Sequence, residues 1–185
     1  SVLLKHKGQS IDLGAIGKGY AAQCAMDKLR AFVLSGACLS IGGNTVVRGS
    51  KADKGLWRVG VQHPRRHDKL LGVVSATEAS LVTSGDYERF FVDRAGERYH
   101  HILDPRTGYP SCSEIISSTV VHEDSLVADA LSTSLFVLGL KRGLSLLAHF
   151  PSAKVVLVDV EGHLYLSKSL EHSFEAFEEA SVTIL

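Results

Sequence analysis

A glycine-rich segment near the start of the chain combines residue types that bind phosphate groups. It runs from Asp12 to Gly19 and holds three glycines beside Lys18. Glycine lets the backbone turn sharply and lets a ligand approach without meeting a Cβ atom. A helix that starts here would direct free N–H groups and a positive dipole end at an anion, and Lys18 adds a charged donor. The pattern matches neither a Walker A loop nor GxGxxG, so a glycine-rich turn with a solvated lysine is the alternative interpretation.

A second group of chemically capable side chains lies in the sequence Asp129-Ala130-Leu131-Ser132-Thr133. At about 3.6 residues per turn, Asp129, Ser132 and Thr133 share one helical face. A carboxylate and a hydroxyl one turn apart, joined by backbone carbonyls, are hard oxygen ligands that suit Mg²⁺. Such ligands favour Mg²⁺ or Ca²⁺ over zinc. The alternative is a polar stripe in which the Thr133 hydroxyl bonds back to the carbonyl four residues earlier.

Polar residues also gather in two further segments between predicted strands. One includes Ser84 and Gly85, and the other includes His101, Arg106 and Thr107. A histidine changes charge near neutral pH, so His101 is a candidate general base or ligand-positioning group. Arg106 and Thr107 are candidate phosphate contacts. The alternative is structural, because Asp-Pro and Thr-Gly pairs form turns and a histidine at a strand end is usually satisfied locally.

A pair of glycines, Gly42 and Gly43, separates two apolar segments. Taken alone, such a pair is best explained as the turn of a hairpin. If the two flanking strands belong to a binding site, the pair would instead allow a flat ring or a phosphate to approach the backbone closely. Both interpretations stay open at the level of the sequence.

The composition describes a globular chain of 185 residues with one hydrophobic core. Twenty basic residues balance twenty acidic ones, which excludes a broad electrostatic surface for nucleic acid or anionic lipid. The longest apolar run, 135–140, falls short of the roughly 20 residues that a bilayer helix needs, so no direct membrane span is expected. Three cysteines cannot form a closed disulfide framework. Cys24 and Cys38 have apolar neighbours and are expected to be buried thiols.

The elements that must position these groups follow from the hydrophobic pattern. Periodic apolar residues predict a helix over 18–34, and Asp124 is a candidate cap for a helix that Gly139 ends. Because strands outnumber helices and short turns join most of them, the fold class is α+β, with a largely antiparallel mixed sheet and two or three packed helices. Strands are expected at 2–5, 9–13, 37–41, 45–48, 56–62, 71–75, 79–83, 90–93, 98–103, 115–122, 154–159 and 163–167, with a second short helix near 141–149.

Taken together and in this order, these segments resemble the ApbE family of FAD:protein FMN transferases. The resemblance spans nearly the whole chain, and five ordered motifs with family-like spacing make it specific. The matching segments are 12–20, 41–44 with 57–61 behind it, 83–89, 101–108, and 129–133 with Leu138-Gly139.

The resemblance implies Mg²⁺-dependent transfer of FMN from FAD to a threonine or serine hydroxyl of a target flavoprotein, which forms a phosphoester. Asp129 and Thr133 would ligate the metal together with the carbonyl of Ala15 and the Ser132 position, and His101 would be the base for the incoming hydroxyl. The candidate FAD-binding positions are Asp12, Lys18 and the backbone near Leu103 from the resemblance, and Gly42, Gly43, Ser84, Gly85, Arg106 and Thr107 from their place in the motifs.

Two departures from the family pattern affect this interpretation. Family members carry a substantial portion before the Asp-Leu-Gly motif, so residues 1–185 are expected to be a single flavin-transferase domain that forms the C-terminal part. Ser132 stands where alanine is commoner, which keeps the backbone carbonyl and adds a hydroxyl. Two alternatives share the same residues, namely a metal-dependent FAD pyrophosphatase that releases FMN and AMP, and a non-catalytic flavin- or ADP-binding module. The residues do not fix the compartment, although the resemblance implies a periplasmic or membrane-associated setting.

Overall fold

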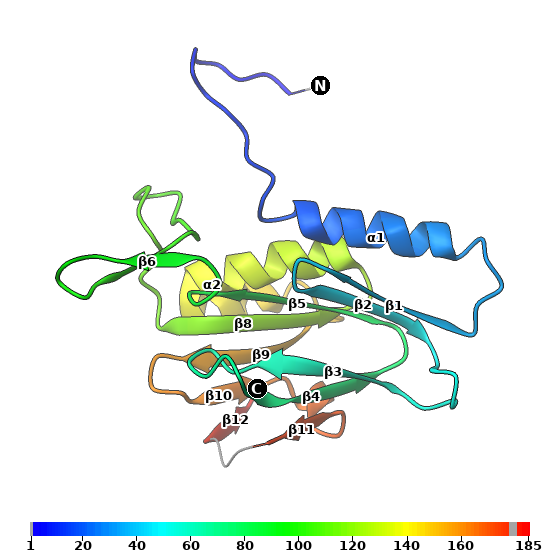
Figure 1. The fold of residues 1–185 in the computed structure, drawn as a ribbon. Helices are drawn as coiled ribbons and strands as arrows, with labels where there is room; N and C mark the ends of the chain where they lie inside the picture. The colour runs from blue at the N-terminus through cyan, green and yellow to red at the C-terminus, as the bar shows by residue number, and fades with distance from the viewer. Residues whose placement is uncertain (1, 178–180) are drawn as a thin grey trace.

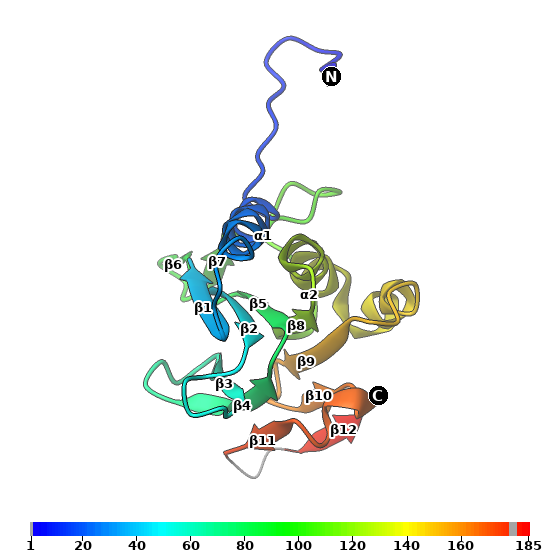
Figure 2. The same cartoon turned by 90° about the vertical axis from the view of Figure 1, so that its right-hand side faces the viewer.

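The computed structural model describes residues 2–177 and 181–185, which fold into three layers. Figures 1 and 2 show two helices side by side on one face of a large sheet and a smaller sheet under the other face. The large sheet has seven strands in the order β1-β2-β5-β8-β9-β10-β12, and each pair is antiparallel except β10 with β12. The strands are β1 (Gly36–Ile41), β2 (Asn44–Gly49), β5 (Ala79–Gly85), β8 (Ile115–His122), β9 (Lys154–Asp159), β10 (Leu164–Leu166) and β12 (Val182–Ile184).

Two smaller sheets complete the strand inventory of the described residues. A three-stranded sheet in the order β11-β4-β3 forms the lower layer, and a two-stranded hairpin, β6-β7, stands apart at one end of the large sheet (Figure 1). A short 3-10 helix, η1 (Lys168–Leu170), precedes β11. The bounds are β3 (Trp57–Gln62), β4 (Leu70–Ala76), β6 (Phe90–Val92), β7 (Arg98–His100) and β11 (Phe174–Ala176).

The helical layer consists of α1 (Gly17–Leu29) and α2 (Ser125–Leu147). The side chain of Asp124 caps α2 by accepting hydrogen bonds from two backbone N–H groups of its first turn. Gly139 interrupts α2 with φ 72°, which divides it into the two helical pieces that the sequence predicted. The Glu114 carboxylate accepts a 2.8 Å hydrogen bond from the backbone N–H of Leu140, which satisfies a donor that the kink exposes.

Among the residues that the structure describes, three apolar clusters hold the layers together. The largest lies between the seven-stranded and three-stranded sheets, and the second joins α2 to the large sheet around Val82, Leu135 and Phe136. The third, between α1 and β2, is small and has only Ala22, Met26 and Val46 as its buried members. By length and composition α2 meets the requirements of a membrane span, but its apolar residues pack on the sheet as those of a core helix do.

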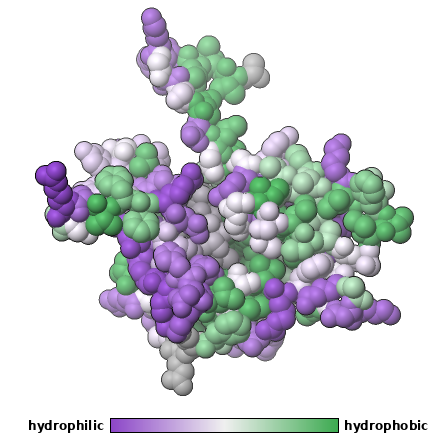
Figure 3. Space-filling view, viewed as in Figure 1, coloured by the Kyte–Doolittle hydropathy of each residue, from purple (hydrophilic) through white to green (hydrophobic). Residues whose placement is uncertain are grey.

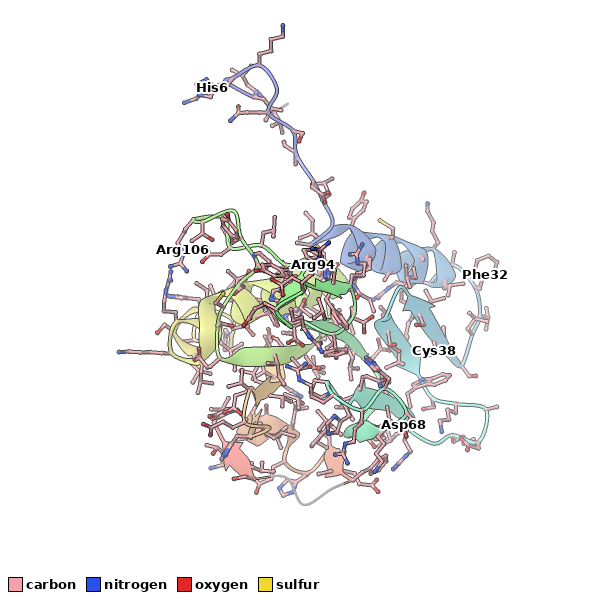
Figure 4. The ribbon with its side chains drawn as sticks, turned by 60° about the vertical axis from the view of Figure 1, so that its left-hand side comes forward. His6, Phe32, Cys38, Asp68, Arg94 and Arg106 are labelled. Atoms are coloured by element: carbon pink, nitrogen blue, oxygen red, sulfur yellow. The ribbon has the colours of Figure 1, made fainter. Side chains whose placement is uncertain are left out.

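The α+β prediction with a mostly antiparallel mixed sheet is confirmed, and several element predictions need correction. Residues 2–5 and 9–13 form no strand, and Figure 1 shows this segment leading away from the body as an extended arm. The first helix ends at Leu29 rather than at 34, and the apolar residues beyond it, Phe32, Val33 and Leu34, are exposed. Figure 3 shows apolar surface at the end of the molecule where Figure 1 places the chain that follows α1. Cys24 and Cys38 are exposed, because α1 buries one narrow face and Cys38 lies on the side of β1 away from α1 (Figure 4).

Candidate functional site

The first turn of α1 meets α2 at a close contact between Gly19 and Asp129. The backbone N–H of Gly19 donates a 2.7 Å hydrogen bond to Oδ2 of Asp129 in a buried setting. A Cβ atom at position 19 would lie 2.3 Å from the Ser125 carbonyl oxygen and 2.6 Å from the Asp129 Cβ. Only glycine permits this approach, so the glycine-rich segment brings a helix N-terminus directly onto the carboxylate.

The Asp129 carboxylate is buried, and its charge is stabilised by three groups. Burial raises the pKa of Asp129, while the Gly19 N–H, the Lys18 charge and the Asn44 amide act in the opposite direction. Asn44, at the start of β2, is 1% exposed, and its Nδ2 has no hydrogen bond of normal geometry to the described residues. This amide was not among the predicted site residues, and the only signal for it in the sequence was an asparagine directly after a glycine pair.

Three hydroxyl groups meet beside Asp129, at the point where β5 ends against α2. Ser84 Oγ lies 2.9 Å from Ser132 Oγ and 3.1 Å from Thr133 Oγ1. Ser132 Oγ donates a 2.9 Å hydrogen bond to the backbone carbonyl of Asp129. The hydrogen-bond partner of the Thr133 hydroxyl is Ser84, so the alternative of a bond back to that same carbonyl is not the arrangement found. The structure places Asp129, Ser132 and Thr133 on one side of α2, as predicted, and adds Ser84 to them as a contact that the sequence did not predict.

Lys18 lies between this cluster and the hairpin turn that joins β1 to β2. Gly42 and Gly43 adopt φ 55° and 92°, so the pair does form the turn that its simplest interpretation predicted. A Cβ at Gly42 would lie 3.0 Å from Lys18 Cδ, which shows that the lysine stem covers the turn. The Lys18 charge lowers the pKa of both Asp129 and His101, so the cation reaches both groups.

The two adjacent histidines have different roles in the structure. His100 is buried, with Nε2 bonded to the Ser111 carbonyl and Nδ1 receiving the Ile102 N–H, so both of its nitrogens are occupied. His101 Nδ1 lies 3.1 Å from the Arg89 carbonyl, which can only accept, so Nδ1 carries the proton. Burial lowers the pKa of His101, and the nearby charges of Arg89 and Lys18 lower it further. A neutral His101 therefore carries an unprotonated Nε2 near pH 7.

The segment that follows β5 is held in place by contacts that the sequence did not suggest. Arg65, in the β3–β4 hairpin that Asp68 marks in Figure 4, forms a bidentate ion pair with the nearly buried Asp86 at 2.6 and 2.8 Å. A Cβ at Gly85 would lie 2.3 Å from the Tyr87 ring. Gly85 therefore has a packing reason to be glycine, separate from any ligand.

In the loop after β7, the polar side chains of Asp104, Arg106 and Thr107 form their hydrogen bonds with other residues of the same loop. Leu103 pairs with Pro110 across the loop, and the Thr107 hydroxyl bonds to the Asp104 carbonyl. The Arg106 guanidinium grips the Asp104 carboxylate and holds the pKa of that carboxyl at about 2. Figure 4 places Arg106 at the outer end of the loop. The hydrogen bonds of Leu103, Arg106 and Thr107 are all within this loop, and among the described residues no hydrogen bond joins them to the Asp129 cluster.

Two predicted residues lie before α1, outside the packed body. Asp12 is exposed, and its Oδ1 accepts a 2.6 Å hydrogen bond from the Gly14 N–H, which is a local turn. Ala15 is exposed in the turn that immediately precedes α1, one helical turn before Gly19. Ala15 therefore lies at the same helix N-terminus as Asp129, whereas Asp12 belongs to the extended arm.

Solved structures share this arrangement of layers. The ApbE protein of Thermotoga maritima matches with a TM-score of 0.81 and 38% identity, over 90% of this chain and 54% of that chain. The apo form of the flavinyl transferase ApbE of Pseudomonas stutzeri matches with a TM-score of 0.75 and 31% identity, over 91% of this chain and 53% of that chain. These matches define one structural class, the layered α+β fold of the ApbE structures.

The chain belongs to the ApbE family, whose model matches residues 1–157. An FAD:protein FMN transferase of Treponema pallidum is 40% identical over 167 residues, which is 85% of this chain and 46% of that protein. Another from Klebsiella pneumoniae is 39% identical over 168 residues, which is 90% of this chain and 51% of that protein. The chain thus spans about half the length of the curated relatives it matches.

Proposed function

We propose that residues 1–185 act as one flavin-transferase domain that moves FMN from FAD to a threonine or serine hydroxyl of a target flavoprotein, with Mg²⁺ as the metal. The observation that carries this proposal is the contact of Asp129 with the first turn of α1, where Lys18 lies, together with the Thr133 hydroxyl one turn further along α2. Phosphoryl transfer depends on positioning and charge neutralisation more than on covalent help from the protein. A carboxylate, a hydroxyl and a lysine at a helix N-terminus supply these requirements.

The donor set fits Mg²⁺ better than a softer metal. Asp129 and Thr133 offer oxygen atoms, the Ala15 carbonyl and the Ser132 position are the further candidates, and the described residues contain no cluster of three or more His, Cys, Asp or Glu side chains. Mg²⁺ is usually held by one or two carboxylates plus substrate phosphates, not by an all-protein cage. When bound, the ion would neutralise charge on the FAD pyrophosphate.

His101 is the proposed base for the incoming hydroxyl. The hydroxyl oxygen forms a bond to the FMN phosphorus, the bond from that phosphorus to the bridging oxygen breaks, and AMP leaves with the bonding electrons. The hydroxyl proton moves to Nε2 of His101, which is unprotonated because Nδ1 holds its proton against the Arg89 carbonyl. The Lys18 charge acts on both His101 and Asp129, so Lys18 is the candidate for stabilising the developing negative charge.

The test combines this chain with FAD, Mg²⁺ and a target flavoprotein, and mass spectrometry measures the FMN adduct on the target. We expect an adduct on threonine or serine that disappears with a chelator and in the Asp129→Asn variant. AMP release without an adduct would assign the site to a pyrophosphatase instead. Mg²⁺-dependent FAD binding without turnover, seen by calorimetry, would assign it to a binding module.

A further inference from the structure

The hydroxyl groups of Ser84, Ser132 and Thr133 form a hydrogen-bond chain, and the carbonyl acceptor at one end allows its direction to be inferred. Ser132 Oγ lies 2.9 Å from the Asp129 carbonyl oxygen, which can only accept, so the Ser132 proton is committed to that carbonyl. Ser132 can then only accept in its 2.9 Å contact with Ser84, so Ser84 donates its proton to Ser132. Ser84 in turn accepts at 3.1 Å, so Thr133 is the donor of the last bond.

This direction decides what Thr133 offers to a cation. A hydroxyl ligates a cation through an oxygen lone pair, so its proton must be placed elsewhere. Ser84 takes that proton, and no other described residue donates a hydrogen bond to Thr133 Oγ1. We propose that Ser84 is a positioning residue, which turns the lone pairs of Thr133 toward the cation shared with Asp129. This role rests on the proposed function, because that function makes Thr133 and Asp129 the ligands.

The strand geometry explains why Ser84, and not its neighbour, can do this. Side chains alternate along β5, so Ser84 faces the same way as Val82, which packs against α2. Thr83 faces the opposite way, and its hydroxyl lies 2.8 Å from that of Thr119 on β8. Thr83 and Ser84 are therefore adjacent hydroxyl residues that lie on opposite faces of the sheet, and only Ser84 lies on the face that α2 covers.

Calorimetric titration of Mg²⁺ into the chain with FAD present tests the proposal without measuring turnover. We expect Ser84→Ala to weaken Mg²⁺ binding roughly tenfold, the range typical of residues that orient a metal ligand. Ser84→Thr keeps the hydroxyl and should bind Mg²⁺ like the unsubstituted chain. Thr83→Val is the matched control, since it removes a hydroxyl from the adjacent position and should leave Mg²⁺ affinity unchanged. Thermal melts without metal compare the folds of all variants.

The outcomes separate this role from the proposed function. Equal Mg²⁺ affinity in Ser84→Ala and the unsubstituted chain, with binding lost in Asp129→Asn, would overturn the role of Ser84 alone. Equal weakening in Ser84→Ala and Thr83→Val would also overturn it, because the loss would then come from the strand. Binding of Mg²⁺ that does not depend on Asp129 would overturn the proposed function and the role of Ser84 together.

Discussion

Replacing Asp129 by alanine or by asparagine separates the two tasks that the structure gives this carboxylate. Alanine removes the acceptor of the Gly19 N–H, which is left buried and unpaired. Such a loss costs about 1–3 kcal/mol of unfolding free energy. Asparagine keeps an oxygen for that N–H and removes only the charge, which burial already disfavours. We therefore expect Asp129→Ala to be destabilised without metal, and Asp129→Asn to be close to the unsubstituted chain.

Adding Mg²⁺ and FAD should separate the asparagine variant from the unsubstituted chain, which it resembles without metal. A ligand present at about 100 times its dissociation constant stabilises the fold by about 2.7 kcal/mol. With Mg²⁺ and FAD, the unsubstituted chain should gain stability of this order, and both variants should gain much less. Urea unfolding followed by circular dichroism, with and without Mg²⁺, measures both effects. A full Mg²⁺-dependent gain in Asp129→Asn would refute the assignment of this residue as a ligand.

The pH dependence of the unfolding free energy provides a second test of the Asp129 assignment. The pKa of Asp129 is raised in the folded chain, so the folded state holds its proton more tightly than the unfolded state. The metal-free chain should therefore lose stability as pH rises from the ordinary aspartate range through the raised pKa. Asp129→Asn should lack this component. An identical pH profile in the two proteins would mean that the buried carboxylate is not penalised.

Three further predictions follow from other contacts. His101→Ala should slow FMN transfer more than it weakens FAD binding, and equal losses in rate and affinity would make His101 a binding residue. Transfer by the unsubstituted chain should fall only when the pH drops below the lowered pKa of His101. Arg106→Ala should reduce stability at neutral pH by an amount that shrinks as pH falls from about 4 to about 2, because Asp104 then protonates in both proteins, and urea titrations across this range measure it. Gly19→Ala should lower the unfolding free energy by about 1–3 kcal/mol through the clash with α2, whereas Gly17→Ala, whose Cβ meets no atom within 4 Å, should not.

The local hydrophobic pattern predicted most strands of the sheet, and it failed for segments whose strand formation depends on a pairing strand. Alternation predicted β8, and the end of the helix was correctly placed at Gly139, because both signals lie within a few residues. Residues 2–5 have a strand-like composition but no strand to pair with among the described residues. The three-residue strands β11 and β12 were missed because so short a segment carries almost no periodicity.

The candidate site was predictable as a set of residues but not as a geometry. The motifs named Lys18, Asp129 and Thr133, yet the bond that joins α1 to α2 links residues 110 positions apart. No spacing rule in the sequence encodes that contact. The reverse holds for Arg106, whose carboxylate partner is only two residues away, so a local ion pair was a readable alternative to a phosphate contact.

The apolar cluster beneath α1 is small, and its size bears on how firmly α1 is held against the rest of the site. A helix held by few buried contacts can detach locally at a lower free energy than global unfolding requires. Each detachment would carry the Gly19 N–H away from Asp129 and dismantle the site while the sheets stay intact. A molecule that contacts both α1 and α2 would favour the docked helix, so amide hydrogen exchange along α1 should slow when such a molecule binds.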